Sequence, residues 1–247
     1  MHITLGKWTQ NKLDSLLHQS AKIKDTGARI DFLSRHFLNI DYKESTLTGS
    51  ADIPEVLAVN LSGIDCFTYL DYIESMRLSG SFSEFMENLK NVRYRNGKIA
   101  FENRNHFFTD WREFNSEFID DVTAKTGGRK TKIIAKILNK KADGTFFING
   151  IKPVRREIKY IPSGVIDDAV MDKIKTGDYA GIYSDMQGLD VSHVGIIIKN
   201  GNAVNLRHAS SEKGKVVEQN FREYIRNKPG MIILRPKFSI EYGGCRC

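Results

Sequence analysis

Cysteine is scarce in this sequence, and the three residues present are unevenly placed. Cys66 stands alone, whereas Cys245 and Cys247 lie near the carboxyl end, separated by one residue. This arrangement is not that of a disulfide framework. The terminal pair has no nearby histidine at zinc-ligand spacing, so no structural metal site is expected there. Cys66 is therefore either a small buried side chain or a nucleophile.

Long apolar runs are also missing. The longest, such as residues 194–198 and 231–234, are far shorter than the roughly 18 residues needed to cross a bilayer. Residues 1–10 lack the charged start and apolar stretch of a secretory signal, and no repeat or low-complexity tract is found. A chain of 247 residues with 40% hydrophobic content is instead expected to fold around a large core, without a membrane span.

Acidic residues are outnumbered by basic ones, which gives a formal net charge of +7 and a pI near 9.2. Such a surface attracts nucleic acid, anionic lipid or acidic wall polymer. The excess of basic residues is concentrated in residues 129–159, which contain ten Lys or Arg but only two acidic residues. Residues 130–140 are expected to form a helix with a solvated or anion-binding charged face. No aromatic residue interleaves with these charges up to Lys141, so nucleic acid is not expected as a partner.

Apolar residues recur at helical spacing early in the chain and at strand spacing later. Two Asn-Gly pairs, at residues 96–97 and 200–201, are strong hairpin signals. Helices first and strands later favour an α+β fold. Helices are predicted over residues 8–38, as two helices, and over 66–80, 81–89 and 163–175. Strands are predicted over residues 56–61, 92–95, 98–101, 179–183, 191–199 and 202–209.

The second Asn-Gly pair brings two histidines together. With residues 200–201 as a two-residue loop, Lys199 pairs with Asn202, and His193 lies directly opposite His208. Directly opposed residues have Cβ atoms about 4.5 to 5.5 Å apart and project from the same face of the sheet. The two imidazoles are therefore expected to be neighbours, as part of a metal site, of a catalytic triad or of a purely structural contact.

A thiol, an imidazole and a second polar ring are the parts of a Cys-His-His triad. Cys66 is predicted at a helix start, where the helix dipole and free N–H groups lower the pKa of a thiol. His193 would take the thiol proton, and His208 would hold His193 in the required tautomer. A metal site would instead need a third ligand, for which Cys66 is the candidate. Spacing alone does not decide between these arrangements.

The residues around these side chains resemble the Cys and His motifs of NlpC-like papain-fold peptidases of bacterial cell walls. The motifs are IDCFTYL at residues 64–70 and SHVGII at residues 192–197, and His208 matches the third catalytic position. Phe67 departs from the superfamily, in which a small residue usually follows the Cys. Over residues 28–234 the chain more specifically resembles the N-acetylmuramoyl-L-alanine amidase-like family. Its distinguishing motifs are VRYR at residues 92–95, NRNHFFTDW at 103–111 and GLDV at 188–191.

The resemblance implies a papain-like fold, with the helix carrying Cys66 packed on an antiparallel sheet carrying both histidines. It implies hydrolysis of the amide between N-acetylmuramic acid and L-alanine in peptidoglycan fragments (muropeptides), and family members favour the anhydro form. Cys66, His193 and His208 would be catalytic, with no metal or organic cofactor. We expect a monomer that is periplasmic or secreted, its signal having been trimmed. A helical extension is expected over residues 1–50 and a catalytic domain over 51–247, with an inserted substrate-binding segment at about 92–160.

A second group of residues is expected to bind substrate. An aromatic ring can pack on a pyranose while amide and carboxylate groups bind hydroxyls. In the alternative, Phe107 and Trp111 anchor this loop to the core, and Asp65, a candidate for binding a substrate amine, caps the helix that begins at Cys66. A zinc-ligand role for His106 lacks clustered partners. The substrate-binding candidates are Asp65, Asn105, His106, Asp110 and Trp111.

Three other functions compete with the amidase. A γ-D-glutamyl-diaminopimelate endopeptidase would use the same triad with a different subsite. A non-catalytic wall-binding module would have Cys66 as a core residue. A nucleic-acid binder, suggested by the charge, lacks a recognised motif.

Overall fold

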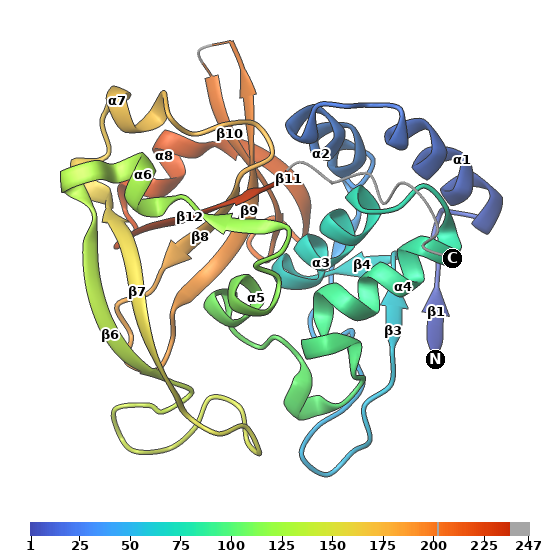
Figure 1. Ribbon diagram of the computed structural model, residues 1–247, viewed down its shortest axis with the longest axis horizontal. Helices are drawn as coiled ribbons and strands as arrows, with labels where there is room; N and C mark the ends of the chain where they lie inside the picture. The colour runs from blue at the N-terminus through green and yellow to red at the C-terminus, as the bar shows by residue number, and fades with distance from the viewer. Residues whose placement is uncertain (202, 238–247) are drawn as a thin grey trace, which may run out of the picture.

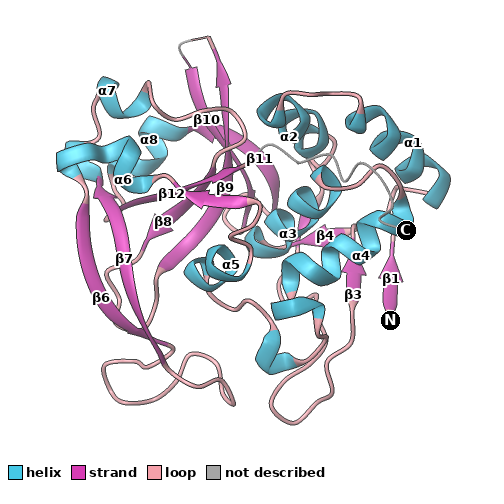
Figure 2. Cartoon of the chain, in the orientation of Figure 1, coloured by secondary structure: helices cyan, strands magenta, loops and turns pink. Residues whose placement is uncertain are grey.

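The computed structural model describes residues 1–201 and 203–237. A large mixed sheet runs through the middle of the molecule, with helices packed around it (Figure 1, Figure 2). This combination confirms the predicted α+β class. Within the described residues, no helix is long and apolar enough to cross a membrane. Cys245 and Cys247 lie outside the described residues.

Within the described part of the chain, ten strands make up the large sheet, and two more form a separate parallel pair. The strands of the large sheet are β2 (Asp41–Tyr42), β4 (Gly63–Ile64), β5 (Ile119–Asp121), β6 (Lys132–Leu138), β7 (Val154–Pro162), β8 (Tyr179–Tyr183), β9 (Val191–Asn200), β10 (Ala203–Ser210), β11 (Lys215–Asn220) and β12 (Gly230–Pro236). Their order is β4-β2-β11-β10-β9-β8-β12-β7-β6, and β5 pairs with β12. The parallel pair is β1 (His2–Thr4) and β3 (Ala58–Asn60).

The helices differ in length and in how much they contribute to the core. They are α1 (Gln10–Ala21), α2 (Thr26–Arg35), α3 (Cys66–Arg77), α4 (Phe82–Arg93), α5 (Phe108–Phe114), α6 (Thr123–Gly127), α7 (Asp168–Met171) and α8 (Phe221–Arg226). The two helices predicted early in the chain are confirmed as α1 and α2. The predicted cap Ser81 is the N-cap of α4, and its side chain accepts a hydrogen bond from the Glu84 N–H. The predicted helix over residues 163–175 is largely wrong, because only α7 and a short 3-10 turn form there.

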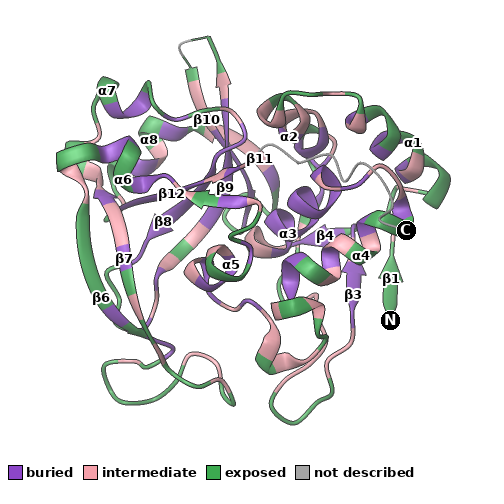
Figure 3. Ribbon diagram, viewed as in Figure 1, coloured by how far each residue is buried: buried purple, intermediate pink, exposed green. Residues whose placement is uncertain are grey.

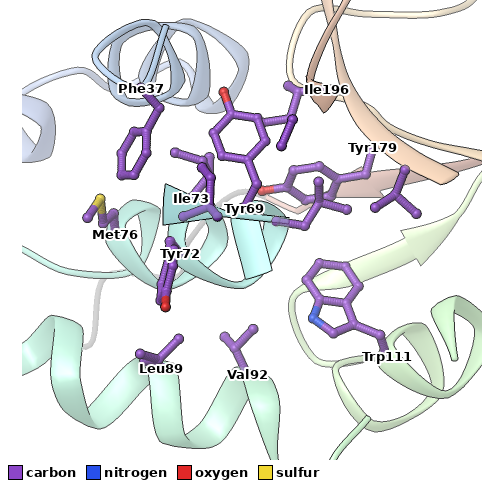
Figure 4. Close-up of a cluster of buried hydrophobic side chains, with 14 of the residues drawn as sticks. Phe37, Tyr69, Tyr72, Ile73, Met76, Leu89, Val92, Trp111, Tyr179 and Ile196 are labelled. Carbon is purple, nitrogen blue, oxygen red and sulfur yellow. The ribbon is translucent and has the colours of Figure 1, made fainter. Parts of the chain in front are cut away.

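Helix α3 lies at the centre of the main hydrophobic core. Every residue from Thr68 to Arg77 is buried, and Figure 4 shows side chains of α3 packed against Phe37 in the turn after α2, Leu89 of α4 and Tyr179 of β8. The charged residues of α3 are paired. Asp71 of α3, for example, accepts a hydrogen bond at Oδ2 from Nε of Arg93 on α4, at 2.8 Å. Packing on all sides fixes the position of the first residue of α3, which is Cys66.

The predicted basic helix over residues 130–140 is wrong, because this segment forms strand β6. It pairs antiparallel with β7, from Lys132 opposite Tyr160 to Leu138 opposite Val154. Isoleucine is β-branched and favours strands, and this preference prevails over the apparent helical spacing. Most of β6 is exposed at the edge of the sheet (Figure 3), but the exposed side chains include Ile133, Ile134 and Ile137, whereas Lys136 is buried, so β6 does not form the predicted charged face over buried isoleucines.

The predicted first hairpin is also wrong. Asn96 and Gly97 adopt positive φ angles of 54° and 64°, as their sequence suggests, but they lie in a 3-10 turn directly after α4. The preceding residues belong to α4, because Arg93 is buried and paired with Asp71 on α3. Tyr94 instead forms an isolated bridge with Arg104, which lies outside the predicted second strand at residues 98–101.

Candidate active site

Cys66 occupies the first position of α3, as predicted. Asp65 is the N-cap, and its Oδ1 accepts from the Phe67 N–H at 2.9 Å and from the Thr68 N–H at 2.7 Å. The Thr68 hydroxyl in turn accepts from the Asp65 N–H at 3.1 Å, which completes a capping box. The capping role of Asp65 is thus confirmed, and binding of a substrate amine by Asp65 remains a prediction.

The second hairpin forms, but its register differs from the predicted one by two residues. Lys199 pairs with Val204 instead of Asn202, and Asn200 pairs with Ala203, because the turn begins at Gly201, whose φ is 59°. His208 therefore lies next to Gly195, where an added Cβ would come within 2.9 Å of the His208 Cβ. Because side chains alternate with a period of two, this shift leaves His193 and His208 on the same face.

The two imidazoles are in direct contact, which confirms the predicted interaction of the rings. His193 Nε2 lies 2.7 Å from His208 Nδ1, and the ring planes are inclined by 86°. On its far side, His208 Nε2 lies 2.7 Å from Gln219 Oε1 of β11. The facing nitrogens bond each other, and the described residues contain no group of three His, Cys, Asp or Glu side chains suited to a metal ion.

Burial keeps both histidines neutral. It lowers the pKa of His193 to about 3, with smaller contributions from His208 and Lys228, and burial also lowers the pKa of His208. Tyr224 of α8 contributes to this enclosure, because its ring centroid lies 5.2 Å from that of His208 and 6.2 Å from that of His193. A neutral imidazole has a lone pair that can accept a proton, but the lowered pKa makes His193 a weak base in the absence of substrate.

The Cys66 thiol is also neutral in this structure. Burial, followed by the charge of Asp65, raises the pKa of Cys66 to about 12, although the backbone N–H groups of Val194, Cys66 and Phe67 act to lower it. The predicted lowering at the helix start is therefore present but outweighed. Among the described residues the thiol has no hydrogen bond to His193. Val194 directly follows His193, so the sulfur lies beside the strand that carries the candidate base.

Trp111 and Phe107 are core residues, and the expectation that either ring packs on a sugar is corrected. Trp111 is 0% exposed, and Phe107 is 4% exposed. The Trp111 Nε1–H donates to Asp71 at 3.0 Å, and its ring meets Tyr179 edge to face with centroids 5.5 Å apart (Figure 4). Neither ring offers a free face, so the structure supports the alternative in which they anchor the segment.

The remaining polar candidates of this segment hold it in place. Asn105 is buried, and its side-chain NH2 donates to the Val92 carbonyl at 3.0 Å. Asp110 is buried and paired with Arg156. The His106 Nε2–H donates to a backbone carbonyl at 2.8 Å, and burial lowers the pKa of His106 to about 4. Direct substrate binding by Asn105, His106 or Asp110 remains a prediction.

Sequence reasoning missed two residues next to the histidines, Gln219 and Tyr224. Gln219 comes from β11, where it is paired with Leu206 of β10. The turn between these strands contains Gly214, with a φ of 67°, but lacks an Asn-Gly pair that would have fixed the register. Tyr224 lies on the short helix α8, for which no sequence signal was recognised.

Comparisons with known proteins find one matching family model and several solved structures of similar fold. The model of the AmiA-like family, described as N-acetylmuramoyl-L-alanine amidase-like, matches residues 32–231. A DUF1460 protein of Legionella pneumophila has a similar structure, with a TM-score of 0.78 and 22% identity over 92% of this chain and 94% of that chain. An N-acetylmuramoyl-L-alanine amidase of Bacteroides uniformis gives a TM-score of 0.71 and 26% identity over 86% and 99%. A candidate xylanase of Bacteroides fragilis gives 0.66 and 26% over 82% and 98%. A comparison with curated proteins finds no match.

Proposed function

We propose that this chain, which belongs to the N-acetylmuramoyl-L-alanine amidase-like family, is a cysteine amidase. Its substrate would be the amide bond between N-acetylmuramic acid and L-alanine in peptidoglycan fragments, preferably in the anhydro form. The observation that carries the chemistry is the 2.7 Å contact between His193 and His208, beside the helix that begins at Cys66. A cell-wall substrate places the enzyme outside the cytoplasm, in the periplasm or after secretion. A papain-like core, with α3 packed on the strands carrying the histidines, is part of this proposal.

The first step is activation of Cys66 by His193. Because Nε2 of His193 bonds His208, Nδ1 is the nitrogen left to accept a proton. A rotation of the Cys66 side chain brings the sulfur to this nitrogen when substrate binds, since contacts between catalytic groups often tighten only then. Thiol and imidazole are both neutral at rest, so the proton moves to Nδ1 as the sulfur attacks the lactyl carbonyl.

The later steps use the same groups in the reverse order. The Cys66 N–H, in the first turn of α3, has no acceptor within the helix and stabilises the oxyanion of the tetrahedral intermediate. The His193 imidazolium then protonates the nitrogen of L-alanine, and the C–N bond breaks to leave a thioester on Cys66. His193 next deprotonates a water molecule that attacks the thioester, which releases the muramyl product and restores the thiol.

The geometry favours this chemistry over the other functions considered. Glycoside hydrolysis, as in a xylanase, uses two carboxyl groups about 5 to 9.5 Å apart, whereas the groups gathered here are a thiol and two imidazoles. A purely structural Cys66 would not require the paired histidines beside it. The endopeptidase uses the same three groups, so only the position of the cleaved bond separates it from the amidase.

Product analysis tests the proposal. Purified protein is incubated with disaccharide tetrapeptides that carry either an anhydro or a reducing sugar end, and the products are identified by mass spectrometry. The expected products are the peptide-free disaccharide and an intact tetrapeptide with a free L-alanine amine, formed faster from the anhydro substrate. A dipeptide left on the sugar would show the endopeptidase, and unchanged substrate would contradict both enzymes.

A further inference from the structure

We infer that Gln219 is a positioning residue that sets the direction of the hydrogen bonds through both histidines and thereby leaves His193 Nδ1 free to act as a base. The inference rests on the proposed cysteine mechanism, but it concerns the protonation of the rings and can be tested without substrate. Gln219 reaches His208 from β11, one strand beyond the histidine pair, with Oε1 2.7 Å from His208 Nε2.

The two rings form a closed chain of contacts. His208 is 2% exposed, and each of its nitrogens has one protein partner, His193 on one side and Gln219 on the other. A neutral imidazole has one N–H donor and one acceptor nitrogen. The hydrogen-bond partner of one ring nitrogen therefore decides whether the other nitrogen is a donor or an acceptor. Because the two rings bond each other, the protonation of one ring also determines that of the other.

The amide oxygen of Gln219 fixes which nitrogen of each ring carries the proton. Because this oxygen can only accept, His208 carries its proton on Nε2 and presents a lone pair at Nδ1. His193 must then donate from Nε2 to this lone pair, and its own lone pair is at Nδ1. With the amide NH2 group turned toward His208, every bond would reverse, and His193 would present an N–H at Nδ1 that cannot take a proton from Cys66.

The His193 imidazolium that forms during catalysis requires the same direction of hydrogen bonding through the two rings. Once His193 has taken the thiol proton, both of its nitrogens are donors, so His208 Nδ1 must still accept. His208 can do so only while its own proton remains on Nε2, bonded to Gln219. The amide cannot take up this proton, and it carries no charge that would raise the pKa of the rings. An amide at this position thus directs the bonds while leaving both imidazoles neutral at rest, as burial also favours.

Three variants separate this role from simple packing. Gln219→Glu keeps an oxygen acceptor and adds a negative charge, Gln219→Leu keeps the size and removes the acceptor, and Gln10→Leu makes the same change on the exposed first turn of α1 as a control. The main readout is nitrogen-15 NMR of the ring nitrogens, which distinguishes Nδ1–H from Nε2–H. The second is the pH dependence of Cys66 alkylation, and thermal melting reports whether each variant is folded.

In the wild type, both rings should carry the proton on Nε2. Gln219→Glu should keep these tautomers and move histidine titration and the acid limb of the pH profile to higher pH, because a nearby negative charge favours the imidazolium. Gln219→Leu should mix the tautomers and slow amide hydrolysis by about tenfold with little change in KM, the size expected for loss of one buried hydrogen bond. Gln10→Leu should match the wild type.

Two results would overturn the inference: a wild-type His208 protonated on Nδ1, or a folded Gln219→Leu variant with wild-type tautomers and pH profile. Failure of the proposed function is a separate result. If the protein does not cleave muropeptides, the NMR tautomers still show whether Gln219 directs the histidine pair, since that measurement needs no substrate.

Discussion

Asp65, the N-cap of α3, affects both the stability of this helix and the pKa of Cys66. Two substitutions of Asp65 separate these effects. Asp65→Ala removes the acceptor for two backbone N–H groups, held at 2.9 and 2.7 Å. Loss of an N-cap to Ala destabilises a protein by about 0.5 to 2 kcal/mol, which lowers the melting temperature by roughly 1 to 8 °C at about 2 to 4 °C per kcal/mol for chains of about this length. Asp65→Asn keeps an oxygen acceptor and caps almost equally well, so its melting temperature should stay near that of the wild type.

Both variants should nevertheless change the pKa of Cys66 in the same direction. The charge of Asp65 is the second cause of the raised Cys66 pKa, after burial, so both substitutions should lower the pKa of the thiol. Iodoacetamide alkylation followed across pH by intact mass measures this pKa, with Cys66→Ala as the blank. Asp65→Ala as stable as the wild type would refute the capping argument. An unchanged or higher thiol pKa in Asp65→Asn would refute the electrostatic one.

Three further predictions concern the thiol, the histidines and Trp111. Wild-type Cys66 should be alkylated more slowly at pH 7 than a free cysteine, with the rate still rising above pH 9, because burial raises its pKa; fast alkylation below pH 7 would show a preformed thiolate instead. Unfolding in denaturant should show stability falling as pH drops from about 6.5 toward 3, since the unfolded chain protonates His193 in this range and the folded chain, with its pKa of about 3, does not; this decline should be smaller in His193→Gln. Trp111→Phe should lose about 1 to 3 kcal/mol of stability, because Asp71 loses a buried hydrogen bond, and leave the KM for muropeptide unchanged; a raised KM at unchanged stability would restore a sugar-binding role.

The parts of the site that depend on local rules could be predicted from the sequence. The helix start at Cys66 follows from the apolar stripe behind it and from the capping residue Asp65. The predicted contact between His193 and His208 is correct although the predicted register was wrong by two residues, because side chains along a strand alternate between the two faces with a period of two. The family resemblance added the substrate class, which no single residue reveals.

The predictions that failed depended on tertiary contacts. The isoleucines of β6 fit a helical spacing, but their β-branching together with pairing to β7 makes the segment a strand. Trp111 was a candidate for binding a sugar, with a core anchor as the alternative, and its contacts with Asp71 and Tyr179 hold it in the core. Gln219 could not be found because its place beside His208 depends on the register of a third strand. The sign of the Cys66 pKa shift likewise depends on burial, which the helix position alone does not determine.

In the proposed mechanism Cys66 is the group that attacks the lactyl carbonyl, and turnover by Cys66→Ala tests this role most directly. Wild type and variant are compared at equal folded concentration, checked by thermal melting, on the same anhydro disaccharide tetrapeptide, with release of the tetrapeptide followed by mass spectrometry. Because removal of a nucleophile leaves only the contributions of binding and the oxyanion donors, the variant should lose at least about a thousandfold in kcat. A folded Cys66→Ala protein that releases the tetrapeptide within about tenfold of the wild-type rate would contradict a thiol mechanism.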